Sequence, residues 1–509
     1  MYLLFLAIPL WSQEETAVAY RYHVPLIGTK TVSLANWSFT LEATAQEDQP
    51  YGLVLIQRDI RGREIGATDF GEQPAHGIFT WNSKAAGVSN RLRTLEIVSD
   101  KALNGILWMS NDVFGQINGV VLSQDLASEL FIPHIPDLFF EVTTSFAVQG
   151  ISGNQEPATI FFHLYDENRS LQQPVNLRTL WPSLGYFSDT PDVTLALGNF
   201  NSNLVPAWAR LTSSNPQYRM AGFQTFSQEP DGDNLPQTAA TELLGQGSPK
   251  GNVLISQREG FWTDEVVLTN PMPVEVQVSF EGFFHEYLDV LNASVLQSVR
   301  ETVLLLPYEK KIFQVGYDLF ADMQAPFVRL AYSAETMEEE PREAAIFALH
   351  FEKSLASEMG SAFFSNGGTL VKTWLTRGLT HESALEVVSL GRQELVFPDD
   401  AEEGTVPEWL VDQTILEMKF FDAEGVVRTT RLNLTAGDIY DQLTLDEIGH
   451  TFGREDLDAA MVLLRVIEGP PILAKVIARG INDIAVVNPY TVSPAPVEIA
   501  TDGEIEVEK

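Results

Sequence analysis

The chain has 509 residues, of which 45% are hydrophobic and 10% aromatic, so it can build several cores and is not a disordered protein. It carries 69 Asp and Glu against 32 Lys and Arg, a formal net charge of −37, which argues against nucleic acid and anionic membrane surfaces as partners. The absence of cysteine excludes disulfides, thiolate metal sites and thiol catalysis.

The N-terminal segment indicates export. Residues 2–11 form an apolar run that is too short to cross a bilayer but suits a signal peptide, and Ala17-Val18-Ala19 offers small residues for cleavage. A basic segment before the run is missing, so residues 1–19 are either a signal peptide or a first strand. No later segment reaches the roughly 18 uninterrupted apolar residues of a membrane-spanning helix.

Two landmarks recur along the chain and predict a repeat. The first is an apolar strand followed by an acidic turn, at Asp59, Asp166, Phe280-Glu281-Gly282 and Asp422. The second is a charged residue between two apolar ones, centred on Glu96, Arg210, Arg329 and Arg465. Spacings of about 110 to 140 residues match a β-sandwich domain rather than a solenoid unit of roughly 20 to 50 residues. Each copy also closes with a glycine before an apolar segment, at Gly119, Gly222, Gly360 and Gly480.

The predicted fold is therefore all-β, with tandem immunoglobulin-like antiparallel β-sandwich domains and a few short helices. The predicted sandwiches cover residues 20–128, 129–242, 243–368 and 369–493, followed by an acidic tail at 494–509. Two larger domains, each a fused pair of sandwiches, are the alternative.

The first two sandwiches open with proline-interrupted strands, which are typical of edge strands or domain entries. His23 lies beside Pro25, and His134 lies beside Pro133. This placement favours a structural role for both histidines at a seam between domains, rather than a metal or catalytic role.

The third predicted sandwich, from about Leu243, contains Trp262-Thr263 and ends its strand at Asn270-Pro271. With Leu164-Tyr165-Asp166, Leu319-Phe320 and the turn Asp422 to Gly425, this segment resembles the tandem β-sandwich repeats of bacterial secreted and cell-surface proteins. The resemblance covers most of the chain, although no copy carries every element. It implies a sandwich fold and export, and it supplies no catalytic residues.

The fourth predicted sandwich is the clearest copy. Residues 414–421 alternate apolar and polar side chains, and Asp422 to Gly425 is expected to turn the chain, with Gly425 in the left-handed conformation. Thr444-Leu445-Asp446-Glu447 is a capping box that predicts one helix of about two turns. Further strands are expected at residues 461–467 and 472–479, and a last one ends at Val487.

Catalytic signatures are absent from the sequence. The eight histidines are scattered, and no H-E-x-x-H, G-x-S-x-G, Walker or G-x-G-x-x-G motif occurs. The only candidate metal ligands are Asp231 and Asp233, in an acidic turn, and Asp399, in the run 399–403. If these residues bind an ion, Ca²⁺ is the expected one, because their ligands are oxygens. An ordinary turn is favoured, because the residues do not have the spacing of an EF-hand loop.

We therefore expect a non-enzymatic, exported bacterial protein, secreted, periplasmic or at the cell surface, that acts as a scaffold or adhesion module and binds other surface proteins or glycans. The first alternative is a carbohydrate-binding array whose platform would use tryptophans at similar strand positions; these are Trp81, Trp108, Trp181 and Trp208. At such positions tryptophan is more often a core residue. The second alternative is a glycoside hydrolase using paired carboxylates.

Overall fold

The computed structural model describes most of the chain. The described residues are 20–26, 37–87, 92–111, 116–122, 126–136, 142–172, 175–180, 185–189, 205–228, 237–255, 262–288, 293–321, 323, 326–354, 359–378, 381–396, 408–422, 425–454, 457–479, 484–487 and 491–492. The predicted signal segment, the acidic tail, Trp181, Asp231, Asp233 and Asp399 lie outside them.

The described chain consists of strands arranged as four successive units, here called units 1 to 4. Unit 1 contains β1 (Tyr20–Pro25), β2 (Trp37–Ala45), β3 (Tyr51–Arg58), β4 (Glu64–Gln73), β5 (Phe79–Asn82), β6 (Thr94–Ser99), β7 (Leu103–Asn111) and β8 (Gln116–Val121). Unit 2 contains β9 (Glu129–Ile132), β10 (Val142–Ser152), β11 (Ala158–Asp166), β12 (Val175–Leu180), β13 (Gly185–Asp189), β14 (Pro206–Ser213), β15 (Tyr218–Gln228) and β16 (Gln237–Glu242). Unit 3 contains β17 (Lys250–Leu254), β18 (Trp262–Thr269), β19 (Val276–Leu288), β20 (Ala293–Leu305), β21 (Lys310–Gln314), β22 (Phe327–Thr336), β23 (Phe347–Ser354) and β24 (Met359–Phe363). Unit 4 contains β25 (Leu370–Thr376), β26 (Glu382–Ser389), β27 (Gln393–Val396), β28 (Glu408–Val411), β29 (Gln413–Phe421), β30 (Val427–Thr435), β31 (Ile439–Leu443), α2 (Leu445–Phe452), β32 (Ala459–Glu468), β33 (Ile472–Arg479), β34 (Ile484–Val487) and β35 (Thr491–Val492).

All four units share one strand order, which confirms the predicted all-β, tandem-sandwich fold. In unit 1 one sheet runs β1-β6-β3-β4 and the other β5-β2-β7-β8, and the corresponding strands pair in the same way in units 2 and 3. Unit 4 keeps this order while inserting the hairpin β27-β28 and adding β35 beside β25. No helix in the described part of the chain is long and apolar enough to cross a membrane.

The strand order shares its centre with the immunoglobulin sandwich but differs at the edges. Second pairs with fifth, and third pairs with sixth and fourth, as strands B–E, C–F and C–C′ do in immunoglobulin domains. The first strand, however, pairs with the sixth, and the seventh with the second. In an immunoglobulin domain the first strand pairs with B and the last with F. The outer strands have therefore exchanged sheets.

The two sequence landmarks occupy equivalent strands. Glu96, Arg210, Arg329 and Arg465 all lie on the sixth strand of their units. Asp59, Asp166 and Asp422 follow or end the third strand, where each carboxylate accepts a backbone hydrogen bond from the turn that follows. The second landmark thus marks the same central strand in all four units, and the first marks the same turn in units 1, 2 and 4.

Two glycines serve a purpose different from the predicted one. Gly282 does not end its strand, since β19 continues to Leu288; a Cβ there would lie 2.6 Å from the Phe327 ring. Gly222 lies within the seventh strand, where a Cβ would meet the carbonyl oxygen of Ala147 at 2.5 Å. Both glycines allow close packing rather than a turn.

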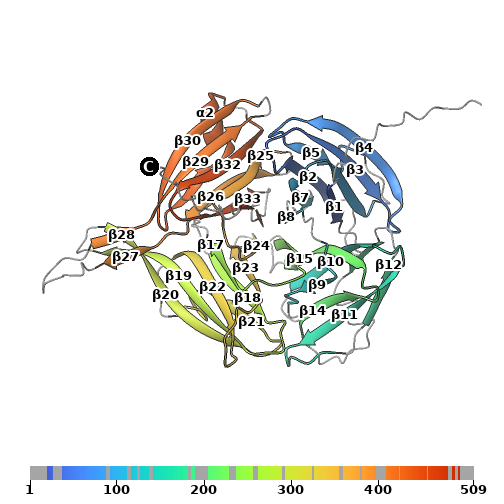
Figure 1. The fold of residues 1–509 in the computed structure, drawn as a ribbon, viewed down its shortest axis with the longest axis horizontal. Helices are drawn as coiled ribbons and strands as arrows, with labels where there is room; N and C mark the ends of the chain where they lie inside the picture. The colour runs from blue at the N-terminus through green and yellow to red at the C-terminus, as the bar shows by residue number, and fades with distance from the viewer. Residues whose placement is uncertain are drawn as a thin grey trace, which may run out of the picture.

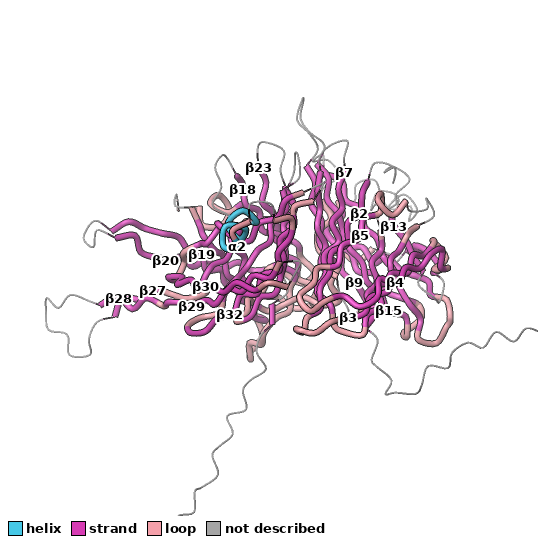
Figure 2. Tube along the Cα trace, turned by 90° about the horizontal axis from the view of Figure 1, so that it is seen from above, coloured by secondary structure: helices cyan, strands magenta, loops and turns pink. Residues whose placement is uncertain are grey.

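The four units form a closed ring (Figure 1). The eighth strands β8, β16, β24 and β34 line its centre, and each contacts the next around the ring, with β34 returning to β8. Between units, β1 of unit 1 packs against β10 and β15 of unit 2, and β17 of unit 3 packs against β33 of unit 4. Figures 1 and 2 both show the hairpin β27-β28 projecting outward from the ring.

The predicted elements of unit 4 are confirmed. Thr444 caps α2, with its side chain accepting a hydrogen bond from the Glu447 amide, and Gly453 ends the helix at φ 68°. Gly425 has φ 79° and donates its amide hydrogen to the carbonyl of Asp422. The helix cap at Thr444 and the turn at Asp422 to Gly425 therefore form as the sequence predicts.

Replacing Gly425 by valine is expected to lower the free energy of unfolding by about 1 to 2 kcal/mol, because a β-branched residue resists positive φ. An added Cβ would meet no atom within 4 Å, so the effect isolates backbone strain. Urea unfolding of the variant and the parent measures it. Gly425→Asn is the matched control and should cost less, because asparagine tolerates this conformation better; equal stability of the valine variant and the parent would contradict the prediction.

Candidate functional sites

Each seam between neighbouring units buries polar groups. At the seam of units 1 and 2, the His23 ring nitrogen Nδ1 lies 3.5 Å from the side-chain nitrogen of Gln149. Ala147 and Phe223 of unit 2 pack into the same apolar cluster as Tyr22 and Val24 of unit 1. His23 thus lies where the sequence placed it, at a domain seam.

Burial lowers the pKa of His23 to about 4, although the nearby Glu96 carboxylate opposes this shift. Glu96 is itself held by Arg21 and Arg58, which lower its pKa against the effect of burial. His23 is therefore neutral at physiological pH.

The seam of units 2 and 3 is similar. His134 is buried between the rings of Phe226 and Phe351, at centroid distances of 5.6 Å to both. Its pKa is well below the usual value because of burial and the positive charges of Lys310 and Lys353. On either side of it, Thr269 donates to the carbonyl of Pro133 at 2.6 Å, and Lys310 donates to that of Ile135 at 2.8 Å.

Acid is expected to weaken the protein at these seams. A buried neutral histidine with a lowered pKa stabilises the fold above its unfolded pKa of 6.5, and that stability is lost as the pH falls towards the folded pKa. Between pH 7.5 and pH 5, His23 alone should account for about 2 kcal/mol.

Urea unfolding at the two pH values tests this expectation. His23→Gln should lose less stability on acidification than the parent, while His450→Gln, at an exposed position on α2, should lose the same amount. An unchanged pH dependence in His23→Gln would contradict the prediction.

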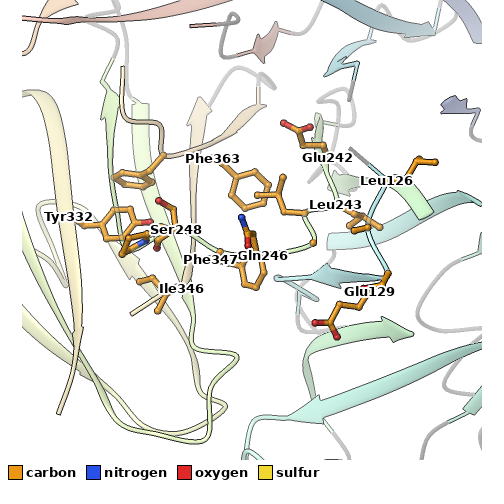
Figure 3. Close-up of a pocket in the computed structure, with 18 residues that line it drawn as sticks. Leu126, Glu129, Glu242, Leu243, Gln246, Ser248, Tyr332, Ile346, Phe347 and Phe363 are labelled. Carbon is orange, nitrogen blue, oxygen red and sulfur yellow. Dashed lines mark hydrogen bonds between the residues drawn. The ribbon is translucent and has the colours of Figure 1, made fainter. Parts of the chain in front are cut away.

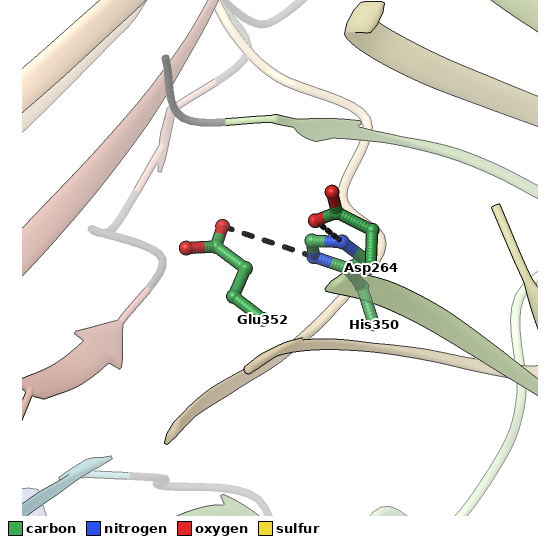
Figure 4. Close-up of side chains that lie close together, drawn as sticks. All are labelled: Asp264, His350 and Glu352. Carbon is green, nitrogen blue, oxygen red and sulfur yellow. Dashed lines mark hydrogen bonds and ion pairs between the residues drawn. The ribbon is translucent and has the colours of Figure 1, made fainter. Parts of the chain in front are cut away.

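The seam of units 3 and 4 holds a denser cluster of charged groups (Figure 4). His350 Nε2 lies 2.9 Å from Asp264 Oδ1, and His350 Nδ1 lies 3.9 Å from Glu352 Oε1. The ammonium group of Lys475, which is 1% exposed, hydrogen-bonds to Glu352 and, at 3.2 Å, to the carbonyl of Leu254. Lys475 thus connects β33 of unit 4 to β23 and β17 of unit 3.

Asp264, His350 and Glu352 offer ligand atoms within 4.8 Å of one another, so a metal site has to be considered. The two carboxylates, however, approach opposite nitrogens of the imidazole ring, as Figure 4 shows. A metal ion binds only one of these nitrogens and would face only one carboxylate. With Lys475 already bound to Glu352, the geometry favours hydrogen bonding and ion pairing over coordination.

The seam of units 4 and 1 closes the ring. Glu42 of β2 is 2% exposed, and its Oε2 accepts hydrogen bonds of 2.8 Å from the indole nitrogens of both Trp108 and Trp374. His381 Nε2 lies 3.9 Å from Glu42 Oε1. Lys372 of β25 adds bonds of 3.1 Å to the carbonyl of Gln46 and to Asp48.

A pocket of about 840 Å³ lies between units 2 and 3, beneath the connecting segment from Leu243 to Pro249. Figure 3 shows Glu242 and Glu129 both on the unit 2 side of the pocket, with Phe347 and Phe363 on the unit 3 side. Burial raises the pKa of Glu242 to about 7. Its carboxylate forms no hydrogen bond or ion pair with any residue that the structure describes.

The tryptophans proposed as a platform are core residues where the structure describes them. Trp81, Trp108 and Trp208 are at most 5% exposed. Trp108 binds Glu42, and Trp208 donates to the carbonyl of Tyr308 across the seam of units 2 and 3. None of these three is available for stacking on a sugar.

Sequence reasoning missed the buried charges Glu42, Glu352 and Lys475, and also Asp264 and Glu242. A signal exists for Lys475, since its strand is apolar on both faces, in the order Ile472-Leu473-Ala474-Lys475-Val476-Ile477-Ala478. Such a strand is buried on both sides, and its single ammonium group must find a partner.

No protein-family model and no curated protein matches the chain.

Proposed function

We propose that the chain is a non-enzymatic, exported scaffold whose four sandwiches form one rigid ring that carries protein-binding surfaces. This proposal rests mainly on one observation: the strongest clusters of buried charge join neighbouring units. Two hydrogen-bonded pairs, Glu352-Lys475 and Glu42-Trp374, join neighbouring units. Both carboxylates are therefore engaged in structural contacts rather than placed for catalysis. The apolar N-terminal run and the resemblance to bacterial surface repeats support export.

The outer side of unit 3 and the adjoining hairpin support partner binding. Large apolar side chains are exposed there; they are Tyr287 (59%), Leu304 (40%), Ile312 (45%), Tyr317 (73%) and Leu410 (60%). They lie on or beside β19, β20, β21 and β28, and β20 contacts β27. Exposed apolar and tyrosine side chains are typical of binding surfaces.

Fractionation of cells that express the tagged chain, followed by crosslinking mass spectrometry on intact cells, tests this function. We expect crosslinks to surface proteins that Tyr287→Ser/Leu410→Ser reduces at least fivefold. Val426→Ser/Val427→Ser changes two other exposed apolar residues (40% and 42%), at the start of β30 in unit 4, and should have no effect. Retention in the cytoplasm, or hydrolysis of glycosides by the pure protein, would contradict the proposal.

A carbohydrate-binding function is the second candidate. A groove of about 680 Å³ crosses β17, β22, β19 and β20 of unit 3 and is lined by amide, hydroxyl and guanidinium groups, including Asn252, Thr302 and Arg300. Arg300 and Arg392 both pair with Glu281, at 3.1 and 3.0 Å, which fixes their orientation. Glycan-array binding that Arg300→Gln removes would favour this function. The glycoside hydrolase is a third candidate; the acids Asp264 and Glu352 lie close together, but His350 and Lys475 already pair with them.

A further inference from the structure

The pocket between units 2 and 3 has a lining of one charge sign. Among the described residues that line it, the ionisable ones are Glu129, Glu242 and Tyr332, and none is a lysine, arginine or histidine. Glu129 is paired with Arg210 of the same unit at 3.6 Å, whereas Glu242 has no partner among the described residues. The free negative charge in the pocket is therefore that of Glu242.

Glu242 departs from the repeat at a position where the other units are apolar. It is the last residue of the central strand β16 and pairs with Phe223 of β15. At the corresponding positions of β8, β24 and β34 the residues are Val121, Phe363 and Val486, which pair with the seventh strand of their units. The fold thus accepts an apolar residue at this position. A carboxylate where the repeat favours an apolar side chain is a departure of the kind expected at functional positions.

The rest of the pocket suits an apolar ligand body. Phe347 and Phe364 are nearly buried beside it, and Phe363, Leu243 and Leu244 complete an apolar wall. A volume of about 840 Å³ falls in the range of small-molecule sites, which often lie between domains. An organic cation in such a pocket would be stabilised both by cation–π attraction to the aromatic rings and by a charge-assisted hydrogen bond to the carboxylate.

We propose that this pocket binds a small organic ammonium ion, whose charged group pairs with Glu242 and whose apolar part packs against Phe347 and Phe363. The ligand supplies the counter-charge that Glu242 lacks. This binding goes beyond the scaffold function and does not depend on it.

Isothermal titration calorimetry at pH 8 tests the proposal with phenethylamine as the probe, with neutral 2-phenylethanol as its matched analogue. We expect the parent to bind the amine at least tenfold more tightly than the alcohol. In Glu242→Val and Glu242→Gln the two affinities should be equal. The valine variant carries the residue of units 1 and 4, so it should fold, and its melting temperature checks this.

A second measurement keeps the test decisive if a variant is altered in stability. Glu129→Gln changes the other carboxylate of the pocket, which is already paired, and should keep at least a third of the affinity for the amine. Phenethylamine should also raise the melting temperature of the parent and not that of Glu242→Gln. Equal binding of amine and alcohol by the parent, undiminished amine binding in both Glu242 variants, or no binding of the amine at 10 mM would overturn the proposal.

Discussion

Replacing Lys475 by methionine is expected to lower the free energy of unfolding by about 3 to 5 kcal/mol, because removal of one member of a buried ion pair leaves the other charge uncompensated. Lys475 and Glu352 are 1% and 3% exposed, so water cannot replace the lost ammonium group. Methionine keeps much of the side-chain volume, which limits any cavity. Urea unfolding at pH 7 measures the difference.

The double variant Glu352→Gln/Lys475→Met separates charge from packing. It removes both charges of the closer pair and keeps that of Glu386, whose Oε2 lies 3.8 Å from the ammonium group of Lys475, so it should recover at least half of the stability lost in Lys475→Met. Lys353→Met is the matched control: Lys353 follows Glu352 in the same strand, but its ammonium group pairs with the half-buried Glu265. Lys353→Met should lower the free energy of unfolding by no more than about 1 kcal/mol. If Lys475→Met lowers it by no more than this control does, the buried pair does not stabilise the seam.

The sandwich fold could be predicted because its signals are local. Strand β29 alternates buried and partly exposed residues along its length, and the turn that follows is fixed by Asp422 and Gly425 within five residues. These patterns repeat with each unit, so one clear copy locates the others. The exchange of the outer strands between sheets was not predictable, because it depends on pairings such as β1 with β6, which are separated by most of a unit.

The ring could not be predicted, because its contacts join residues with no sequence relation. Glu42 and Trp374 are 332 positions apart. Glu42 lies in β2, where Leu41 and Ala43 face the core, so period-two alternation assigns it to the solvent side. In the ring that side is covered by β25 of unit 4, and the residue is buried. Alternation identifies the face of a strand but not what covers it.

Replacing Glu42 by alanine is expected to open the ring. The chain itself links units 1 to 2, 2 to 3 and 3 to 4, whereas units 4 and 1 meet only through non-covalent contacts. Loss of the carboxylate leaves the indole N–H groups of Trp108 and Trp374 without their acceptor, at a cost of about 1 to 3 kcal/mol each. We expect a total loss of about 2 to 5 kcal/mol, concentrated at this seam.

Distance measurements across the seam distinguish opening from general destabilisation. Because the chain has no cysteine, Thr68→Cys on β4 and Thr429→Cys on β30, both exposed, provide the only labelling sites for energy transfer. In Glu42→Ala the transfer efficiency should fall at urea concentrations well below those of the unfolding transition. Small-angle scattering at these concentrations should show a larger radius of gyration. Glu42→Gln keeps a carbonyl oxygen for the indoles and should retain the closed distance. If the alanine variant unfolds without an earlier loss of transfer, the ring is not closed by this carboxylate, and the wider contacts of Lys372 with Gln46 and of His76 with Phe421 hold units 1 and 4 together.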